Sequence, residues 1–208
     1  MYKNFFFIVF EGIEGSGKSS HSLSLIKKLK SLKIPCVYLR EPGGSKNAEY
    51  IRNFLLKNEN KEFNSLTDTL LYFAARNENF LKKIKPFYKK KIIICDRFID
   101  STTAYQIYGK GVNKHFINSI HKYILKGLKP DLTFILISNI SKAFKRMNKR
   151  KSKNRYDKFS ANFYKKVQKA FVKIGKSNMK RYVILDNSKD TPEIEKIILK
   201  KIIKLLNK

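Results

Sequence analysis

The sequence predicts an α/β fold, in which a five-stranded parallel sheet carries helices on both faces. Two observations predict this class. Five short apolar runs alternate along the 208 residues with segments of helical periodicity. A glycine-rich loop, residues 12–19, separates the first apolar run from the first helical segment. Right-handed crossovers make such a sheet doubly wound, and ligands then bind beyond the carboxyl ends of its strands.

Each apolar run is expected to be a strand, because a strand covered on both faces needs apolar residues throughout. The expected strands are 5–10, 35–40, 91–96, 131–137 and 181–186. The expected helices are 19–32, 46–57, 66–85, 101–108, 113–125, one from 141, 161–177, and one after 191 with Pro192 in its first turn. Helical spacing places Leu23, Ile26 and Leu29 on one face of the first helix, and Ile194, Ile197, Ile198 and Leu205 on one face of the last.

Composition limits the class of protein. Hydrophobic residues make up 42% of the chain, and the net charge is +30. That charge fits a nucleic-acid footprint, a site for phosphate-rich molecules, or drift in surface composition. The lysines are spread over the whole chain without a basic stripe that interleaves with stacking aromatics, so we expect no specific nucleic-acid partner. The apolar stretches are too short for a membrane span or a signal sequence, which predicts a cytoplasmic protein without a membrane partner.

The two cysteines, Cys36 and Cys95, form neither a disulfide framework nor a zinc pattern. Both lie in apolar runs, where buried and reduced side chains are expected. We also expect one domain over residues 1–208, since no linker or internal repeat divides the chain.

Residues 12–19 (GIEGSGKS) match the pattern G-x-x-x-x-G-K-[ST] between an expected strand and an expected helix. Backbone N–H groups of such a loop, with the helix N-terminus, bind the phosphates of a nucleoside triphosphate. Lys18 is expected to reach the β and γ phosphates, and the Ser19 hydroxyl to bind Mg²⁺. The candidate ATP-binding residues are Gly12, Gly15, Ser16, Gly17, Lys18, Ser19 and Ser20.

Asp96 and Arg97 end the third apolar run. Asp96 suits a second metal-holding position that acts through water, or else a cap at the strand end. Arg97 has the planar fork that binds a monophosphate, or else forms a salt bridge with Asp96.

These residues belong to a longer pattern that resembles the thymidylate kinases. The resemblance runs from about residue 10 to residue 171 and rests on five segments in order. They are 10–20 (FEGIEGSGKSS), 40–45 (REPGGS), 70–76 (LLYFAAR), 96–106 (DRFIDSTTAYQ) and 154–157 (NRYD). The resemblance implies transfer of the γ-phosphoryl group of ATP to dTMP, which gives dTDP for dTTP synthesis. It also implies Mg²⁺ as cofactor and a homodimer.

The resemblance assigns a set of residues to dTMP. Tyr72 would stack on thymine, Arg76 and Arg97 would grip the monophosphate, and Tyr105 would crowd the sugar 2′ position. Ser101 or Thr102 would bond the base edge, and Glu14 the 3′-hydroxyl. The full set is Glu14, Arg40, Tyr72, Arg76, Arg97, Ser101, Thr102, Tyr105, Gln106 and Tyr156.

Structural alternatives stay open for several of these residues. Tyr72 suits a helix core, and Arg76 suits a surface salt bridge. Arg40 suits an ion pair with Glu41, which itself suits either a metal shell or a turn. Ser101 suits a helix cap, and Glu14 suits a solvent-facing loop.

Phosphoryl transfer needs positive charge on the moving group. Some thymidylate kinases carry an arginine after the P-loop acid, where this chain has Gly15. The resemblance therefore implies the other form, with a basic lid at about 146–160. Nine Lys or Arg residues and one acid lie from Lys142 to Lys158. Arg150 and Arg155 are the candidates for this charge, and Lys18 and Arg97 complete the set of catalytic candidates. Arg150 is also a candidate to lie on adenine.

No general base is expected, since the acceptor is already an anionic phosphate oxygen. His21, His115 and His121 are interpreted as structural. The competing hypotheses are a kinase for another nucleoside or nucleoside monophosphate and a nucleic-acid-binding P-loop protein.

Overall fold

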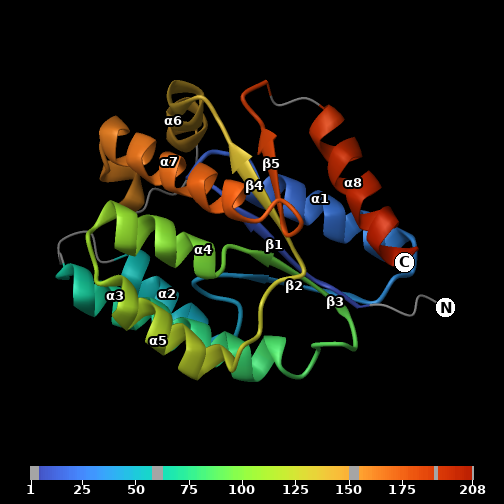
Figure 1. Ribbon diagram of the computed structural model, residues 1–208, viewed down its shortest axis with the longest axis horizontal. Helices are drawn as coiled ribbons and strands as arrows, with labels where there is room; N and C mark the ends of the chain where they lie inside the picture. Colours follow the sequence, from blue (N-terminus) through green and yellow to red (C-terminus); the bar gives the residue numbers. More distant parts are fainter. Residues whose placement is uncertain (1–4, 58–62, 150–154, 190–191, 208) are drawn as a thin grey trace.

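The computed structural model describes residues 5–57, 63–149, 155–189 and 192–207. Five parallel strands form one sheet in the order β2-β3-β1-β4-β5 (Figure 1). Their bounds are Phe7–Glu11 (β1), Cys36–Arg40 (β2), Ile92–Asp96 (β3), Leu132–Ile137 (β4) and Tyr182–Asp186 (β5). The α/β class and the five-stranded parallel sheet are therefore confirmed. The carboxyl ends of β2 to β5 match the expected bounds, and the other strand ends differ by one or two residues.

The helices run between these strands. They are α1 (Lys18–Ser31), α2 (Lys46–Lys57), α3 (Ser65–Asn79) with the π-helical turn η1 (Phe80–Ile84), α4 (Ile99–Thr102) with the π-helical turn η2 (Thr103–Gly109), α5 (Lys114–Leu125), α6 (Ile140–Asn148), the short 3₁₀ turn η3 (Arg155–Lys158), α7 (Ala161–Ser177) and α8 (Pro192–Leu206). The helix expected over 101–108 begins earlier, at Ile99, and continues as η2 to Gly109. None of the helices in the described ranges is long and apolar enough to cross a membrane.

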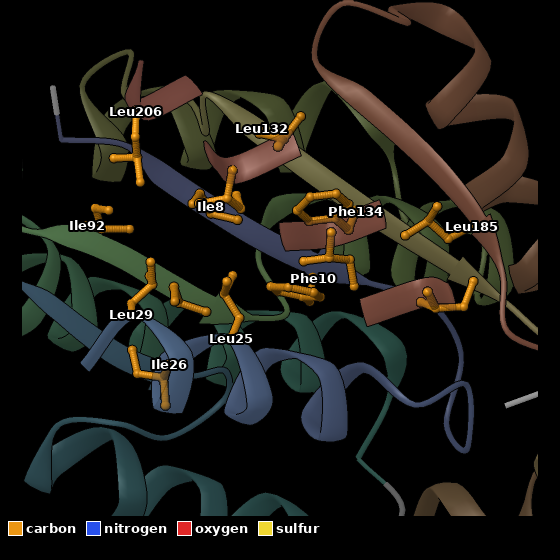
Figure 2. Packing of buried hydrophobic residues seen from close by; sticks show 14 of the residues in the cluster. Ile8, Phe10, Leu25, Ile26, Leu29, Ile92, Leu132, Phe134, Leu185 and Leu206 are labelled. Atoms are coloured by element: carbon orange, nitrogen blue, oxygen red, sulfur yellow. The ribbon is translucent and has the colours of Figure 1, made fainter. Parts of the chain in front are cut away.

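The two faces of the sheet have separate cores, because alternate strand residues point in opposite directions. Ile8 and Phe10 face α1 and α8, where they pack with Leu25, Leu29 and other apolar side chains (Figure 2). Phe7 and Val9 face the opposite layer, under η1 and the region of α5. β1 thus lies between two helix layers, which explains why its sequence is apolar at every position.

Four expectations about burial are wrong in detail. Leu23 on α1 and Ile197 on α8 are exposed, whereas Leu25, Ile194, Ile198, Ile202 and Leu206 form the buried faces. Leu205 is only half-buried. Cys36 is half-buried as well, because β2 is an edge strand, whereas Cys95 in β3 is fully buried; both are free thiols.

Candidate active site

The glycine-rich loop joins β1 to α1 at the carboxyl edge of the sheet. Gly17 has φ 95° and ends the loop, and α1 begins at Lys18. Gly15 has φ +71°, and a Cβ on it would lie 2.3 Å from the Ala143 carbonyl oxygen, so the backbone of α6 packs directly on the loop. The expected strand–loop–helix context is therefore present, and these two positions of the loop accommodate glycine but no side chain.

Lys18 turns back onto the loop, where its Nζ donates a hydrogen bond to the Ile13 carbonyl at 2.6 Å. Burial, with a smaller contribution from Arg97, lowers the pKa of Lys18 to about 7, although Asp96 and Glu14 oppose this shift. An anion bound in the loop would favour the charged form of Lys18, because it offsets the cost of burying the positive charge.

Ser19 and Asp96 meet at the adjacent ends of α1 and β3, where the Ser19 hydroxyl donates to an Asp96 carboxylate oxygen. β1 and β3 are neighbouring parallel strands, so their carboxyl ends bring the loop and Asp96 together. The described residues contain no group of three or more His, Cys, Asp or Glu side chains that could hold a metal. One hydroxyl and one carboxylate fit Mg²⁺, which takes few protein ligands and completes its shell with phosphates and water.

One cavity of about 460 Å³ opens along this edge of the sheet. It is bounded by the glycine-rich loop, the ends of β2 and β3, α2, α3, the α4–η2 helix, α6 and η3. Most of the site residues expected from the sequence line it: Glu14, Gly15, Gly17, Lys18, Ser19, Ser20, Arg40, Tyr72, Arg76, Asp96, Arg97, Ser101, Thr102, Tyr105, Gln106 and Tyr156. Gly12 and Ser16 are buried behind the loop and are not among the lining residues.

Arg97, Glu14 and Tyr105 form a buried group on one wall. Arg97 Nη2 pairs with Glu14 at 2.7 Å, and the Tyr105 hydroxyl donates to the other Glu14 oxygen. Burial alone would raise the pKa of Glu14, but Arg97 and Lys18 lower it below its ordinary value. Glu14 is therefore an anion within the cavity wall, and the alternatives of a solvent-facing Glu14 and an Arg97–Asp96 pair are wrong.

Arg76 is buried and almost fully engaged by the protein. Its Nε pairs with Glu41 at 2.7 Å, and its Nη1 contacts Thr102 Oγ1 at 2.8 Å and His121 Nε2 at 2.7 Å. Its Nη2 donates to the Phe98 carbonyl at 3.0 Å. One N–H of the guanidinium group remains, so Arg76 cannot offer a two-pronged fork to a phosphate in this conformation. The alternative of a surface salt bridge is also wrong, since the Glu41 partner is buried as well.

Tyr72 lines the cavity, whereas its neighbour Phe73 is buried in edge-to-face contact with His121. Tyr72 and Arg76 lie four residues apart on α3 and both reach the cavity. The Tyr72 hydroxyl contacts the hydroxyl of Tyr156 from η3. Burial raises the pKa of Tyr72 to about 12, so it stays neutral.

The polar side chains of the α4–η2 helix are used in different ways. The Ser101 hydroxyl donates to Glu11 at 2.5 Å and accepts from Arg97 at 3.1 Å. Thr102 accepts from Arg76, and Gln106 is buried against the cavity. The alternative of Ser101 as a helix cap is wrong, because α4 begins at Ile99 and its cap position, Phe98, makes no side-chain bond.

Arg40 stands at the end of β2, and its side chain is 44% exposed. Its partner is Glu49 at 3.7 Å and not Glu41, which pairs with Arg76. The ion pair with Glu41 that the sequence left open is therefore wrong. A half-exposed arginine on the cavity rim has freedom to move toward a ligand.

The two lid candidates have different outcomes. Arg155 does not line the cavity: its Nη2 pairs with the buried Asp68 of α3, which also accepts from Lys110 at 2.7 Å. Burial alone would lower the pKa of Arg155, but Tyr72, Tyr156 and Asp68 raise it. Arg150, with Lys151 and Lys153, lies outside the described residues.

Sequence reasoning missed Arg52 and Leu56 of α2, which line the cavity, and three further residues in or behind its wall. Arg146 of α6 lines the cavity and donates to the Gly15 carbonyl at 3.1 Å and to the Asn187 carbonyl at 3.1 Å. Glu11, at the end of β1, is fully buried and bonds the start of α4. His121 receives a bond from Arg76, and burial together with that cation lowers its pKa to about 2. Arg146 stood at the edge of the expected lid, but among nine basic residues nothing marked it out.

The chain matches a family model described as thymidylate kinase over residues 10–198. It is 41% identical to a thymidylate kinase from Mycoplasma capricolum, in an alignment that covers 94% of this chain and 95% of that one. It is 37% identical to a thymidylate kinase from Sulfurihydrogenibium sp., with 93% and 95% covered. The crystal structure of thymidylate kinase from Ehrlichia chaffeensis superposes with a TM-score of 0.76 at 33% identity, covering 97% of this chain and 99% of that one.

Proposed function

This chain belongs to the thymidylate kinase family and phosphorylates dTMP to dTDP with ATP, and on that premise we propose that both substrates bind together in the cavity beside Lys18. ATP occupies the glycine-rich loop, and dTMP occupies the side lined by Tyr72, Arg97 and Tyr105. One observation carries this proposal. Side chains from β3, α3 and the α4–η2 helix, distant in sequence from the P-loop, converge on the same space as its lysine.

The dTMP side has one wall for the phosphate and one for the base. Arg97 supplies cationic N–H groups beside the loop, and the half-exposed Arg40 closes the rim. Tyr72 offers a neutral aromatic face, as stacking on a flat base requires. Arg76 contributes its single remaining N–H, so Arg97 carries more of the phosphate than Arg76 does. Tyr105, held by Glu14, limits the space around the sugar.

Thymidine, which has the base and sugar without the phosphate, separates these roles. Arg97→Met weakens dTMP binding by about tenfold or more and changes thymidine binding by less than about twofold. Tyr72→Ala weakens both ligands by similar factors. Titration calorimetry measures each affinity. Equal losses for dTMP and thymidine in Arg97→Met would remove Arg97 from the phosphate site.

Mg²⁺ is proposed to bind beside Ser19 and Asp96. When bound, it neutralises charge between the β and γ phosphates. Ser19 and Asp96 hold their oxygens at the mouth of the loop, where a hydroxyl ligand and a water-mediated carboxylate are both available. Asp96→Asn should raise the Mg²⁺ concentration needed for half-maximal rate, with little change in the affinity for dTMP.

We assign the chain to the form of the family with a basic lid at about 146–160. Gly15 supports this assignment, because a side chain there meets the backbone of α6 at once, so the loop has no room for an arginine. Arg146 already lines the cavity from the lid's first residue. Arg150 and Arg155 stay the candidates for the transition-state charge, and Arg155 must first leave Asp68 to act there.

Single-turnover kinetics distinguish the two candidates. The catalytic arginine, replaced with Ala, lowers the transfer step by about 10³-fold or more with a much smaller loss of ATP affinity. If Arg155→Ala has little effect on transfer and Arg150→Ala has this effect, Arg155 serves to dock the lid on α3. If neither variant slows transfer, the lid does not supply the charge.

A homodimer through α2 and α3 is the proposed assembly. Tyr50 and Phe54 on α2, with Leu66 and Leu70 on α3, are 45–64% exposed, and each pair lies four residues apart on one helix face. The two helices pack against each other (Figure 1). Analytical ultracentrifugation should find a dimer that Leu70→Glu dissociates and that Tyr123→Glu, an exposed change on α5, leaves intact. A monomeric native chain would exclude this assembly.

The cytoplasmic location stays a prediction.

A further inference from the structure

Glu11 is a buried carboxylate that does not line the cavity. It is the last residue of β1 and is fully buried. One carboxylate oxygen accepts the backbone N–H groups of Phe98 at 2.8 Å and Ser101 at 3.1 Å, and the other accepts the Ser101 hydroxyl at 2.5 Å. Glu11 thus accepts three hydrogen bonds from residues more than 85 positions away in the sequence. These bonds fix the position of the segment from Phe98 to Ser101.

Arg97 directly precedes this segment, and its backbone conformation needs to be stabilised by neighbouring contacts. Arg97 has φ +73°, in the left-handed region that side chains other than glycine adopt only at some cost. The next peptide N–H, that of Phe98, is the one that Glu11 accepts. Glu11 therefore stabilises the backbone turn that directs the Arg97 side chain toward the cavity.

The Arg97 guanidinium is held by the same group. Its Nη1 donates to the Gly12 carbonyl at 3.0 Å and to the Ser101 hydroxyl oxygen at 3.1 Å. A hydroxyl has one hydrogen and two lone pairs, and that of Ser101 gives its hydrogen to Glu11 and a lone pair to Arg97. We propose that Glu11 and Ser101 are positioning residues that hold Arg97 in the orientation for the dTMP phosphate. This inference rests on the proposed role of Arg97.

The chain of bonds persists in both protonation states of Glu11. Burial, with the nearby Asp100, raises the pKa of Glu11 to about 8. An ionised Glu11 accepts the Ser101 hydrogen, whereas a protonated one can donate to the Ser101 oxygen. In either state, the Ser101 oxygen keeps a lone pair for Arg97.

The same geometry argues against Ser101 as a reader of the base edge. Its hydrogen and one of its lone pairs are already used within the protein. Donating a hydrogen bond to thymine would require breaking the contact with Glu11, which would leave a buried carboxyl oxygen without a partner. The two roles predict opposite responses to a ligand that lacks the phosphate.

Ser101→Ala tests the inference by titration calorimetry with dTMP and thymidine. We expect the Kd for dTMP to rise about fivefold to tenfold and the Kd for thymidine to change by less than about twofold. Thr103→Val is the matched control, since its hydroxyl bonds only the Ile99 carbonyl within the same helix, and both affinities should be unchanged. Equal weakening of both ligands makes Ser101 a base contact, and no change in either leaves it without a role; both results overturn the proposal.

Glu11→Ala and the double variant test the connection. Glu11→Ala should weaken dTMP and spare thymidine, and Ser101→Ala added to it should cost no more than about twofold further, since both changes break one chain of bonds. Additive losses would overturn the proposed chain of bonds. The failure of Arg97→Met to spare thymidine would instead reject the proposed phosphate site, so the two claims fail separately. Circular dichroism verifies that each variant is folded, and Ser101→Ala alone decides the matter if Glu11→Ala is not.

Discussion

Gly15 and Gly111 have nearly the same backbone conformation in very different surroundings. Their φ angles are +71° and +74°. A Cβ on Gly15 would lie 2.3 Å from the Ala143 carbonyl oxygen, whereas a Cβ on Gly111 would have nothing within 4 Å. Alanine at either position pays the same left-handed strain of about 1 kcal/mol. Only Gly15→Ala must also push α6 away from the loop.

The contact at Gly15 sets the expected difference. Restoring ordinary contact needs a shift of about 1 Å in packed backbone, and overpacking of this kind costs about 1–3 kcal/mol more. Gly15→Ala should therefore lower the free energy of unfolding by about 2–4 kcal/mol, against about 1 kcal/mol for Gly111→Ala. Because α6 also carries Arg146, bonded to the Gly15 carbonyl, Gly15→Ala should weaken ATP binding by about tenfold or more.

Urea unfolding followed by far-ultraviolet circular dichroism measures the stabilities, since the chain has no tryptophan to report by fluorescence. Calorimetry measures the affinity for ATP. Gly111→Ala should leave that affinity unchanged. If the two variants lose equal stability and bind ATP alike, the close packing of α6 on the loop does not constrain the site, and the reason given for the absence of a loop arginine is wrong.

Three further predictions concern buried charges. The folded pKa of Glu11, about 8, exceeds the ordinary value of 4.5, so its stabilising contribution is complete below pH 4.5 and is lost as the pH rises toward 8. The free energy of unfolding should therefore fall more over this range in the wild type than in Glu11→Gln, by at most about 5 kcal/mol. Parallel curves of unfolding free energy against pH for the two proteins would contradict this. Because the pKa of Lys18 is lowered to about 7, this side chain is mostly neutral at pH 8 and takes up a proton when ATP binds. ATP binding at pH 8 should therefore take up as much as about one more proton in the wild type than in Lys18→Met. Calorimetry in buffers of different ionisation enthalpy measures this uptake, and equal uptake in the two proteins would refute the prediction. Asp68→Asn leaves Lys110 and Arg155 without their carboxylate and should lower the free energy of unfolding by about 3 kcal/mol. The same change should cost less in a protein that already carries Arg155→Met. An equal cost in both backgrounds would show that Arg155 draws no benefit from Asp68.

The fold was accessible to sequence reasoning because its strands are covered on both faces. Solid apolar runs such as that of β3 have no other common interpretation when helical segments separate them. The bounds of α7, 161–177, were predicted to the residue. Burial on amphipathic helices was harder, because Leu23 and Ile197 fit helical spacing as well as their buried neighbours do. Only the position of the helix against the sheet decides which of them is covered.

Within the site, motifs placed the residues but not their partners. The positions of Lys18, Tyr72 and Arg97 on the cavity agree with the sequence prediction. The sequence alone does not indicate that Arg76 is engaged by four protein groups, or that Glu11 bonds Ser101, 90 residues away. An acid at the end of an apolar strand resembles an ordinary cap until the opposite segment is placed. Such long-range hydrogen bonds leave no periodic pattern in the sequence.

The most direct measurement of the central claim is a crystal structure of the protein with dTMP and a non-hydrolysable ATP analogue bound. We predict that the triphosphate lies in the loop at Lys18, the thymine lies against Tyr72, and the acceptor phosphate contacts Arg97 between them. A dTMP phosphate bound away from Arg97, or a base outside the wall formed by Tyr72, would contradict the account.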